Sequence, residues 1–151
     1  MKPLFWQIVP SLFLVLLGVQ PAFSLPAITS STTSVASNLT LDGEGSASTH
    51  IVKVANLELS TDDSDGLTLT ISSESLTKSG ENSIPFQVTT VAADSGSPSA
   101  SDFPVSSDNN YKVSTSSAGS SSKHLYIKYT PAAVQDPGAY NTSISLVVKD
   151  N

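Results

Sequence analysis

The sequence contains no cysteine and no arginine. Seven lysines stand against 13 Asp and Glu in 151 residues, which gives a formal net charge of −6. An acidic chain without arginine is poorly equipped for nucleic acid, because phosphate recognition uses basic, fork-shaped donors. The absence of cysteine excludes disulfides, thiolate zinc sites and a cysteine nucleophile. The length fits a single domain.

The N-terminus has the features of a secretory signal peptide. Lys2 precedes an apolar run at residues 12–17, and the small side chains of Ala22 and Ser24 satisfy the rule for cleavage after Ser24. An uncleaved anchor is the alternative, but a membrane span needs about 20 apolar residues, and Pro3, Pro10 and Pro21 confine the clean run to roughly half of that. We therefore expect residues 1–24 to be removed. The remaining chain is expected to be secreted, either extracellular or at the cell surface, and free of the membrane.

The composition after residue 24 indicates a thin core and a surface rich in hydroxyl groups. Residues 25–151 contain 27 Ser and 14 Thr. Residues 25–46 show no sustained period and end in a turn cluster, so we interpret them as an extended Ser/Thr-rich leader with at most one edge strand at residues 35–41. Residues 47–151 are expected to form the folded domain.

The domain shows the alternation of apolar and polar residues that is typical of short, half-buried strands. In the first of these, a change of parity at Val54 and Ala55 predicts a β-bulge. No segment after residue 24 has the period of an amphipathic helix. The sequence therefore predicts an all-β fold with two packed antiparallel sheets. Strands are predicted at residues 50–60, 67–71, 84–89, 111–113, 125–129 and 140–148.

Two connections are unusual. Residues 94–110 are too long for an ordinary connection in a compact domain, so this segment is expected to be either mobile or functional. Residues 114–122 are nearly all Ser, Thr, Ala and Gly, and we interpret them as a floppy hairpin tip.

The last strand is preceded by a recognisable turn. Asp136-Pro137-Gly138-Ala139-Tyr140 has the D-x-G-x-Y spacing of a tyrosine corner, in which the phenol hydroxyl bonds to backbone a few residues upstream. Pro137 presets φ and Gly138 permits a positive φ. The alternative is a plain turn before an ordinary strand tyrosine.

These segments resemble a known group of proteins. The runs at residues 127–131, 136–140 and 144–148 are similar to the C-terminal half of small exported bacterial β-sandwich proteins related to spore coat U, fimbrial subunits and WxL-type surface domains. Residues 65–71 are similar to their central region. The resemblance implies an immunoglobulin-like antiparallel β-sandwich and a role in surface assembly. The chain differs from these families in lacking cysteines and the Trp-x-Leu element.

Residues with catalytic chemistry do not form a pattern. His50 and His124 are too far apart in sequence to suggest a metal site, since zinc catalysis needs three protein ligands with recognisable spacing. There is no G-x-S-x-G element. The glutamates show no pairing that suggests glycosidase carboxylates. We therefore do not expect an enzyme. The glutamates are Glu44, Glu58, Glu74 and Glu81.

The densest acidic cluster is a weak calcium candidate. Asp62, Asp63 and Asp65 stand on a loop that ends at Gly66, and carboxylate oxygens are suitable calcium ligands. The helix-loop-helix calcium motif is absent, because its first and twelfth positions hold Thr61 and Ser72. A solvated loop between strands is the alternative.

The functional prediction is a secreted, non-catalytic structural or adhesive surface module that associates with itself or with other surface proteins through strand edges. Residues 140–148 contain no Lys, no Pro and no charge, so this strand could accept another strand if it lies at a sheet edge. If it is central, its apolar residues are simply core. The alternative function is a monomeric extracellular binding domain that holds calcium or a glycan with the loops at residues 61–66 and 94–110.

Overall fold

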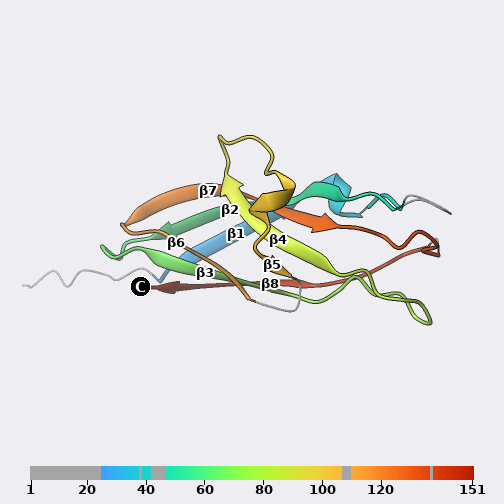
Figure 1. Cartoon of the computed structure of the whole chain (residues 1–151). Coiled ribbons are helices and arrows are strands. Elements are labelled where there is room, and N and C mark those ends of the chain that lie inside the picture. The colour runs from blue at the N-terminus through green and yellow to red at the C-terminus, as the bar shows by residue number, and fades with distance from the viewer. Residues whose placement is uncertain (1–24, 38, 42–46, 107–109, 137) are drawn as a thin grey trace, which may run out of the picture.

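The chain forms two antiparallel β-sheets that lie face to face (Figure 1). The computed structural model describes residues 25–37, 39–41, 47–106, 110–136 and 138–151, so the predicted signal peptide lies outside the described residues. One sheet has the order β1-β2-β7-β4-β5 and the other the order β6-β3-β8. The predicted all-β fold with two antiparallel sheets is confirmed.

Strands account for nearly all of the regular structure in the described residues. None of the described helices is long and apolar enough to cross a bilayer. The strands are β1 (Ala27–Thr32), β2 (His50–Thr61), β3 (Leu67–Ser73), β4 (Phe86–Ala92), β5 (Val105–Ser106), β6 (Tyr111–Ser114), β7 (Gly119–Tyr129) and β8 (Ile144–Asp150). The short 3₁₀ helices are η1 (Ser34–Ser37) and η2 (Ala100–Asp102).

The long antiparallel pair of β2 and β7 forms the centre of the larger sheet. Its register shifts between Lys53 and Ala55, which confirms the bulge expected from the sequence. A bulge adds one residue to one strand and so reverses which side chains face the core. Beyond it, Ala55, Leu57 and Leu59 are all buried.

The core lies between the two sheets and is built from alternate residues of each strand. In β3, Leu69 and Ile71 are 0% exposed, while Thr68 and Thr70, which precede them, are only half-buried. Val88 of β4 meets them from the larger sheet and is also fully buried. The period of two that predicted these strands therefore follows from one face packing and the other meeting water.

The first strand was not expected. All six residues of β1 pair with β2, from Ala27 opposite Ser60 to Thr32 opposite Ala55. Residues 27–32 therefore belong to the larger sheet and not to an extended leader. The edge strand predicted at residues 35–41 is wrong, because η1 occupies Ser34–Ser37.

The described part of the connection at residues 94–110 packs against the larger sheet. Phe103 is only 4% exposed, and its carbonyl accepts a hydrogen bond from Gln87 Nε2 at 3.2 Å. The Nζ atom of Lys128 donates to the Ala100 carbonyl at 2.7 Å and lies 5.3 Å from the centre of the Phe103 ring. These contacts come from the face of β4 and β7 that points away from β3, where Figure 1 shows this connection covering the sheet.

The predicted hairpin tip at residues 114–122 is shorter than expected. β7 begins at Gly119, and its first residues pair with the end of β2, from Gly119 opposite Thr61 to Ser122 opposite Glu58. Only residues 115–118 connect β6 to β7. The prediction of a floppy tip is thus wrong for residues 119–122.

Candidate functional site

The turn before β8 is a tyrosine corner. The Tyr140 hydroxyl donates to the Asp136 carbonyl at 3.0 Å and accepts a hydrogen bond from Gln135 Nε2 at 2.6 Å. Gly138 has a φ of +136°, which disfavours any residue with a Cβ. The motif is confirmed, while Pro137 lies outside the described residues. The corner fixes the direction in which the chain enters β8.

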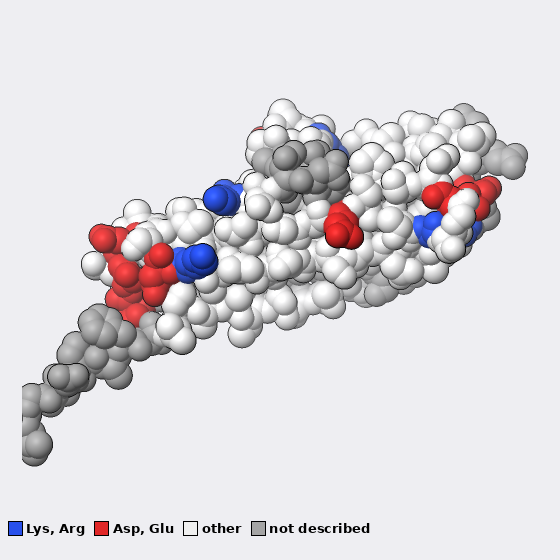
Figure 2. Space-filling model, turned by 90° about the horizontal axis from the view of Figure 1, so that it is seen from below, with Lys and Arg blue, Asp and Glu red and all other residues white. Residues whose placement is uncertain are grey.

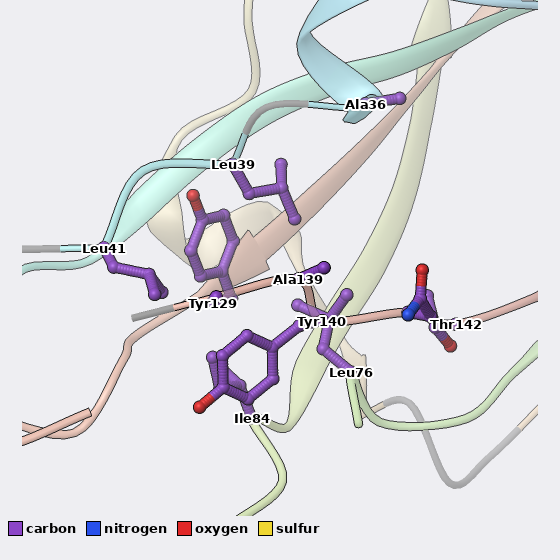
Figure 3. Close-up of a pocket in the computed structure, with 11 residues that line it drawn as sticks. Ala36, Leu39, Leu41, Leu76, Ile84, Tyr129, Ala139, Tyr140 and Thr142 are labelled. Carbon is purple, nitrogen blue, oxygen red and sulfur yellow. The ribbon is translucent and has the colours of Figure 1, made fainter. Parts of the chain in front are cut away.

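A pocket of about 590 Å³ opens beside this corner (Figure 3). Leu39 and Leu41 lie on one side and Leu76 and Ile84 on another, with the Tyr129 ring among them. Not one of its described lining residues carries a charge. The pocket is lined by Ala36, Leu39, Leu41, Leu76, Ile84, Tyr129, Gly138, Ala139, Tyr140, Asn141 and Thr142.

Hydrogen bonds hold two walls of this pocket in place. The Tyr129 hydroxyl donates to the Thr40 carbonyl at 3.1 Å, which ties residues 39–41 to the end of β7. On the opposite side, Thr77 and Asn141 exchange two backbone hydrogen bonds of 2.9 Å. Hydrogen bonds therefore fix residues 39–41 to β7 and join the connecting segments at Thr77 and Asn141 to each other.

A second hollow of about 340 Å³ continues inward from the pocket, between β1 and β8. The two share Ala36, Leu39, Leu76 and Thr142 in their linings. Phe86, Leu125 and Ile127 of the larger sheet line the second hollow, together with Ile144 and Leu146 of β8. The pocket and the hollow therefore adjoin each other, and the hollow reaches residues of the core.

Among the described residues, the charged groups beside the pocket lie at its rim. The Lys78 ammonium lies 5.8 Å from the centre of the Tyr140 ring and 3.9 Å from a Glu81 carboxylate oxygen. A side-chain hydrogen bond with Asp136 raises the pKa of Glu81, and burial and the Asp136 charge act in the same direction. A Cβ added at Gly138 would lie 3.2 Å from Lys78 Nζ, so the lysine packs directly on the pocket wall.

The acidic loop at residues 62–65 lies at the far end of the sandwich. Asp63 Oδ1 accepts from the Asp65 amide at 2.8 Å, and Asn151 Nδ2 donates to the Asp65 carbonyl at 2.9 Å. Figure 2 shows acidic side chains gathered towards the two ends of one face, with a largely uncharged surface between them. Among the described residues, no three His, Asp or Glu side chains come together as a metal site. Asp62, Asp63 and Asp65 therefore do not form such a cluster in this part of the chain, and calcium binding by this loop stays a prediction.

The other residues considered for chemistry lie apart. His50 stacks on Tyr129 with ring centres 5.2 Å apart, whereas His124 pairs with Asn56 across the larger sheet. Glu58 accepts a hydrogen bond of 2.5 Å from the Ser122 hydroxyl. Glu44 lies outside the described residues. The described histidines therefore occupy two separate positions on the sheet.

One edge of the smaller sheet is formed by β8. The backbone N–H of Asn151 donates to the carbonyl of Gly66, just before β3, at 3.1 Å, and hydrogen-bonded and non-hydrogen-bonded pairs alternate along an antiparallel ladder. The N–H and C=O groups of Ile144, Leu146 and Val148 therefore point away from β3, towards the open edge. Val147 is a large apolar side chain that is 47% exposed on the outer face.

The sequence predicted the corner and left open whether the last strand lies at an edge, but it carried no signal for the pocket. Its described lining residues lie at positions 36, 39, 41, 76, 84, 129 and 138–142, which are distant in sequence and share no common motif. Comparison with protein-family models, with curated proteins and with solved structures gave no match.

Proposed function

We propose that this protein is a secreted, non-catalytic structural module of the cell surface that assembles through the open edge of β8. The export step rests on the signal peptide predicted at residues 1–24. The assembly step rests on one observation: β8 lies at a sheet edge and carries no charge before Lys149. A stretch of edge strand without charge or proline, such as residues 144–148, is a template for pairing with another chain.

The other edges are less suited to strand addition. β5 has two residues and β6 has four, so both are shorter than β8. β1 is uncharged, but Ile28 is its only large apolar residue. β8 has seven residues, four of them large and aliphatic, so a strand added there would bury the most apolar surface.

A pair of variants at Val148 tests this proposal. Val148→Pro removes an N–H that points to the open edge, whereas Val148→Ala keeps the N–H and removes most of the side chain. Because edge strands tolerate proline, both variants are expected to fold. Light scattering after size-exclusion chromatography over a wide concentration range should show association of the wild type and of Val148→Ala, but not of Val148→Pro.

Two results would overturn the proposal. One is a wild type that stays monomeric at every concentration. The other is association of Val148→Pro that equals that of Val148→Ala, because assembly would then not involve the backbone of β8. Thermal unfolding of both variants is the control for folding.

A further inference from the structure

We propose that the pocket beside the tyrosine corner binds the alkyl chain of an uncharged, single-chain amphiphile. This inference is separate from the proposed assembly, because it concerns the space between the sheets and not the backbone edge of β8. Its basis is the shape of the cavity, the chemistry of its lining and the charge at its rim.

Shape favours a linear ligand. The pocket alone measures about 590 Å³, within the range of roughly 300–1,000 Å³ in which small molecules bind. The second hollow of about 340 Å³ lies next to it, and the two share four lining residues. We expect a flexible chain that enters at the corner to extend past Leu76 towards Phe86 and Ile144.

The lining favours a chain without charge. The described lining residues of both hollows are aliphatic, aromatic or neutral polar, and the hydroxyls of Tyr129 and Tyr140 already bond to protein atoms. A charged group placed among them would lose its hydration without gaining a partner. An alkyl chain has no such groups to satisfy and would cover the partly buried side chains of Leu39 and Ile144.

The rim selects the head group. Lys78 is the one cation among the described groups at the mouth, and the carboxyls of Glu81 and Asp136 lie beside it. Two carboxyls beside one ammonium repel an anionic head group, so a carboxylate at the mouth is disfavoured. A hydroxyl head group can bond to these residues or to water without that repulsion. The expected class is therefore a long-chain alcohol or a neutral ester, and not a fatty acid.

Displacement of the fluorophore N-phenyl-1-naphthylamine tests the assignment. Dodecan-1-ol and dodecanoate share one chain and differ in the charge of the head group. Dodecan-1-ol should displace the fluorophore and bind more tightly than dodecanoate. Tighter binding of dodecanoate, or no displacement by either molecule, would overturn the proposal.

Variants locate the binding. Ala139 is exposed and lines the mouth, so Ala139→Trp should block entry and weaken dodecan-1-ol binding about tenfold or more. Val134 is 76% exposed and lies outside the lining, and Val134→Trp is the matched control with unchanged binding. Any binding of the fluorophore or the alcohol to the apolar run at residues 12–17 is the same in both variants. A difference in affinity between the two variants therefore reports on the pocket. Equal affinities in the two variants would contradict the proposal.

A third variant tests the role of the rim. Glu81→Gln removes one carboxylate and leaves the pocket wall intact, since Glu81 is not a lining residue. The difference in affinity between dodecan-1-ol and dodecanoate should shrink in Glu81→Gln. An unchanged difference would show that the rim does not select the head group and would overturn that part of the assignment.

Discussion

Removal of the Tyr140 hydroxyl measures how strongly the corner holds the entry to β8. Tyr140→Phe deletes the bond to the Asp136 carbonyl and the bond from Gln135 Nε2. A neutral hydrogen bond contributes about 0.5–1.5 kcal/mol net. Asp136 is exposed, and Gln135 keeps its bond to the Asn82 carbonyl at 3.0 Å, so water or other groups replace part of the loss. We expect the free energy of unfolding to fall by about 1–2 kcal/mol.

Equilibrium unfolding in urea is the assay. For a slope of about 1–3 kcal/mol per M, this loss lowers the midpoint by roughly 0.3–2 M while the slope stays unchanged. Tyr126→Phe is the matched control, because the Tyr126 hydroxyl lies 3.4 Å from Ser97 Oγ, near the limit of a hydrogen bond. Its midpoint should move much less than that of Tyr140→Phe.

Two outcomes would refute this reasoning. If Tyr140→Phe leaves the midpoint unchanged, its two hydrogen bonds contribute nothing net and the corner is only a turn. If Tyr140→Phe and Tyr126→Phe shift the midpoint equally, the shift follows from the loss of a phenol hydroxyl at any position and is not specific to the corner. A double-mutant cycle with Gln135→Ala separates the two bonds, since coupled neighbours deviate from additivity by about 0.5 kcal/mol or more.

Three further predictions concern stability and titration. Gly66→Ala should lower the free energy of unfolding by more than about 2 kcal/mol, because φ is +85° and the new Cβ would lie 2.4 Å from the Thr115 carbonyl oxygen. Gly80 has a similar φ but open space around it. Gly80→Ala should therefore lower the free energy of unfolding by only about 1–2 kcal/mol, and chemical denaturation measures both. Ser121→Ala should raise the unfolding midpoint, since Ser121 Oγ is buried without a hydrogen-bond partner. Hydrogen bonds from Ser99 lower the pKa of Asp102, so NMR titration should show this carboxyl protonating below the ordinary Asp range, and any stability it adds is lost as pH falls through that pKa.

The sequence predicted the strands whose two faces differ. β3 alternates Leu67, Leu69 and Ile71 with threonines, and the structure buries one set and leaves the other at least partly exposed. The change of parity in β2 located the bulge for the same reason. In such strands successive side chains point to opposite faces of the sheet, so the alternation of apolar and polar residues predicts the strand directly.

Strands that pair mainly through backbone were missed or shortened. In β1, only Ile28 packs against the core, so the segment has no apolar period to detect. The start of β7 is Gly119 followed by a run of serines, yet it completes the ladder to the end of β2. Hydrogen bonds between strands do not require apolar side chains, so these segments read as loop from sequence alone.

The long connection at residues 94–110 illustrates a third possibility beside mobility and function. Its sequence is polar except for a few residues, and one of them, Phe103, is buried against the larger sheet. A single buried aromatic ring covers a large apolar area, and the bond from Lys128 to the Ala100 carbonyl satisfies a backbone acceptor. The burial of Phe103 could not be predicted from the sequence, because the residues that it contacts lie on β4 and β7.

The two proposals can be separated in one set of measurements, since they depend on different atoms. Assembly needs the N–H of Val148, and ligand binding needs the open mouth at Ala139. The Val148 variants leave the described lining of the pocket unchanged, and Ala139→Trp leaves the β8 backbone unchanged. Loss of association with retained binding of dodecan-1-ol in Val148→Pro, and the reverse in Ala139→Trp, would establish both. If dodecan-1-ol instead prevents association of the wild type, filling the hollow changes the β8 edge, and the two sites are coupled through Ile144 and Leu146, which belong to both.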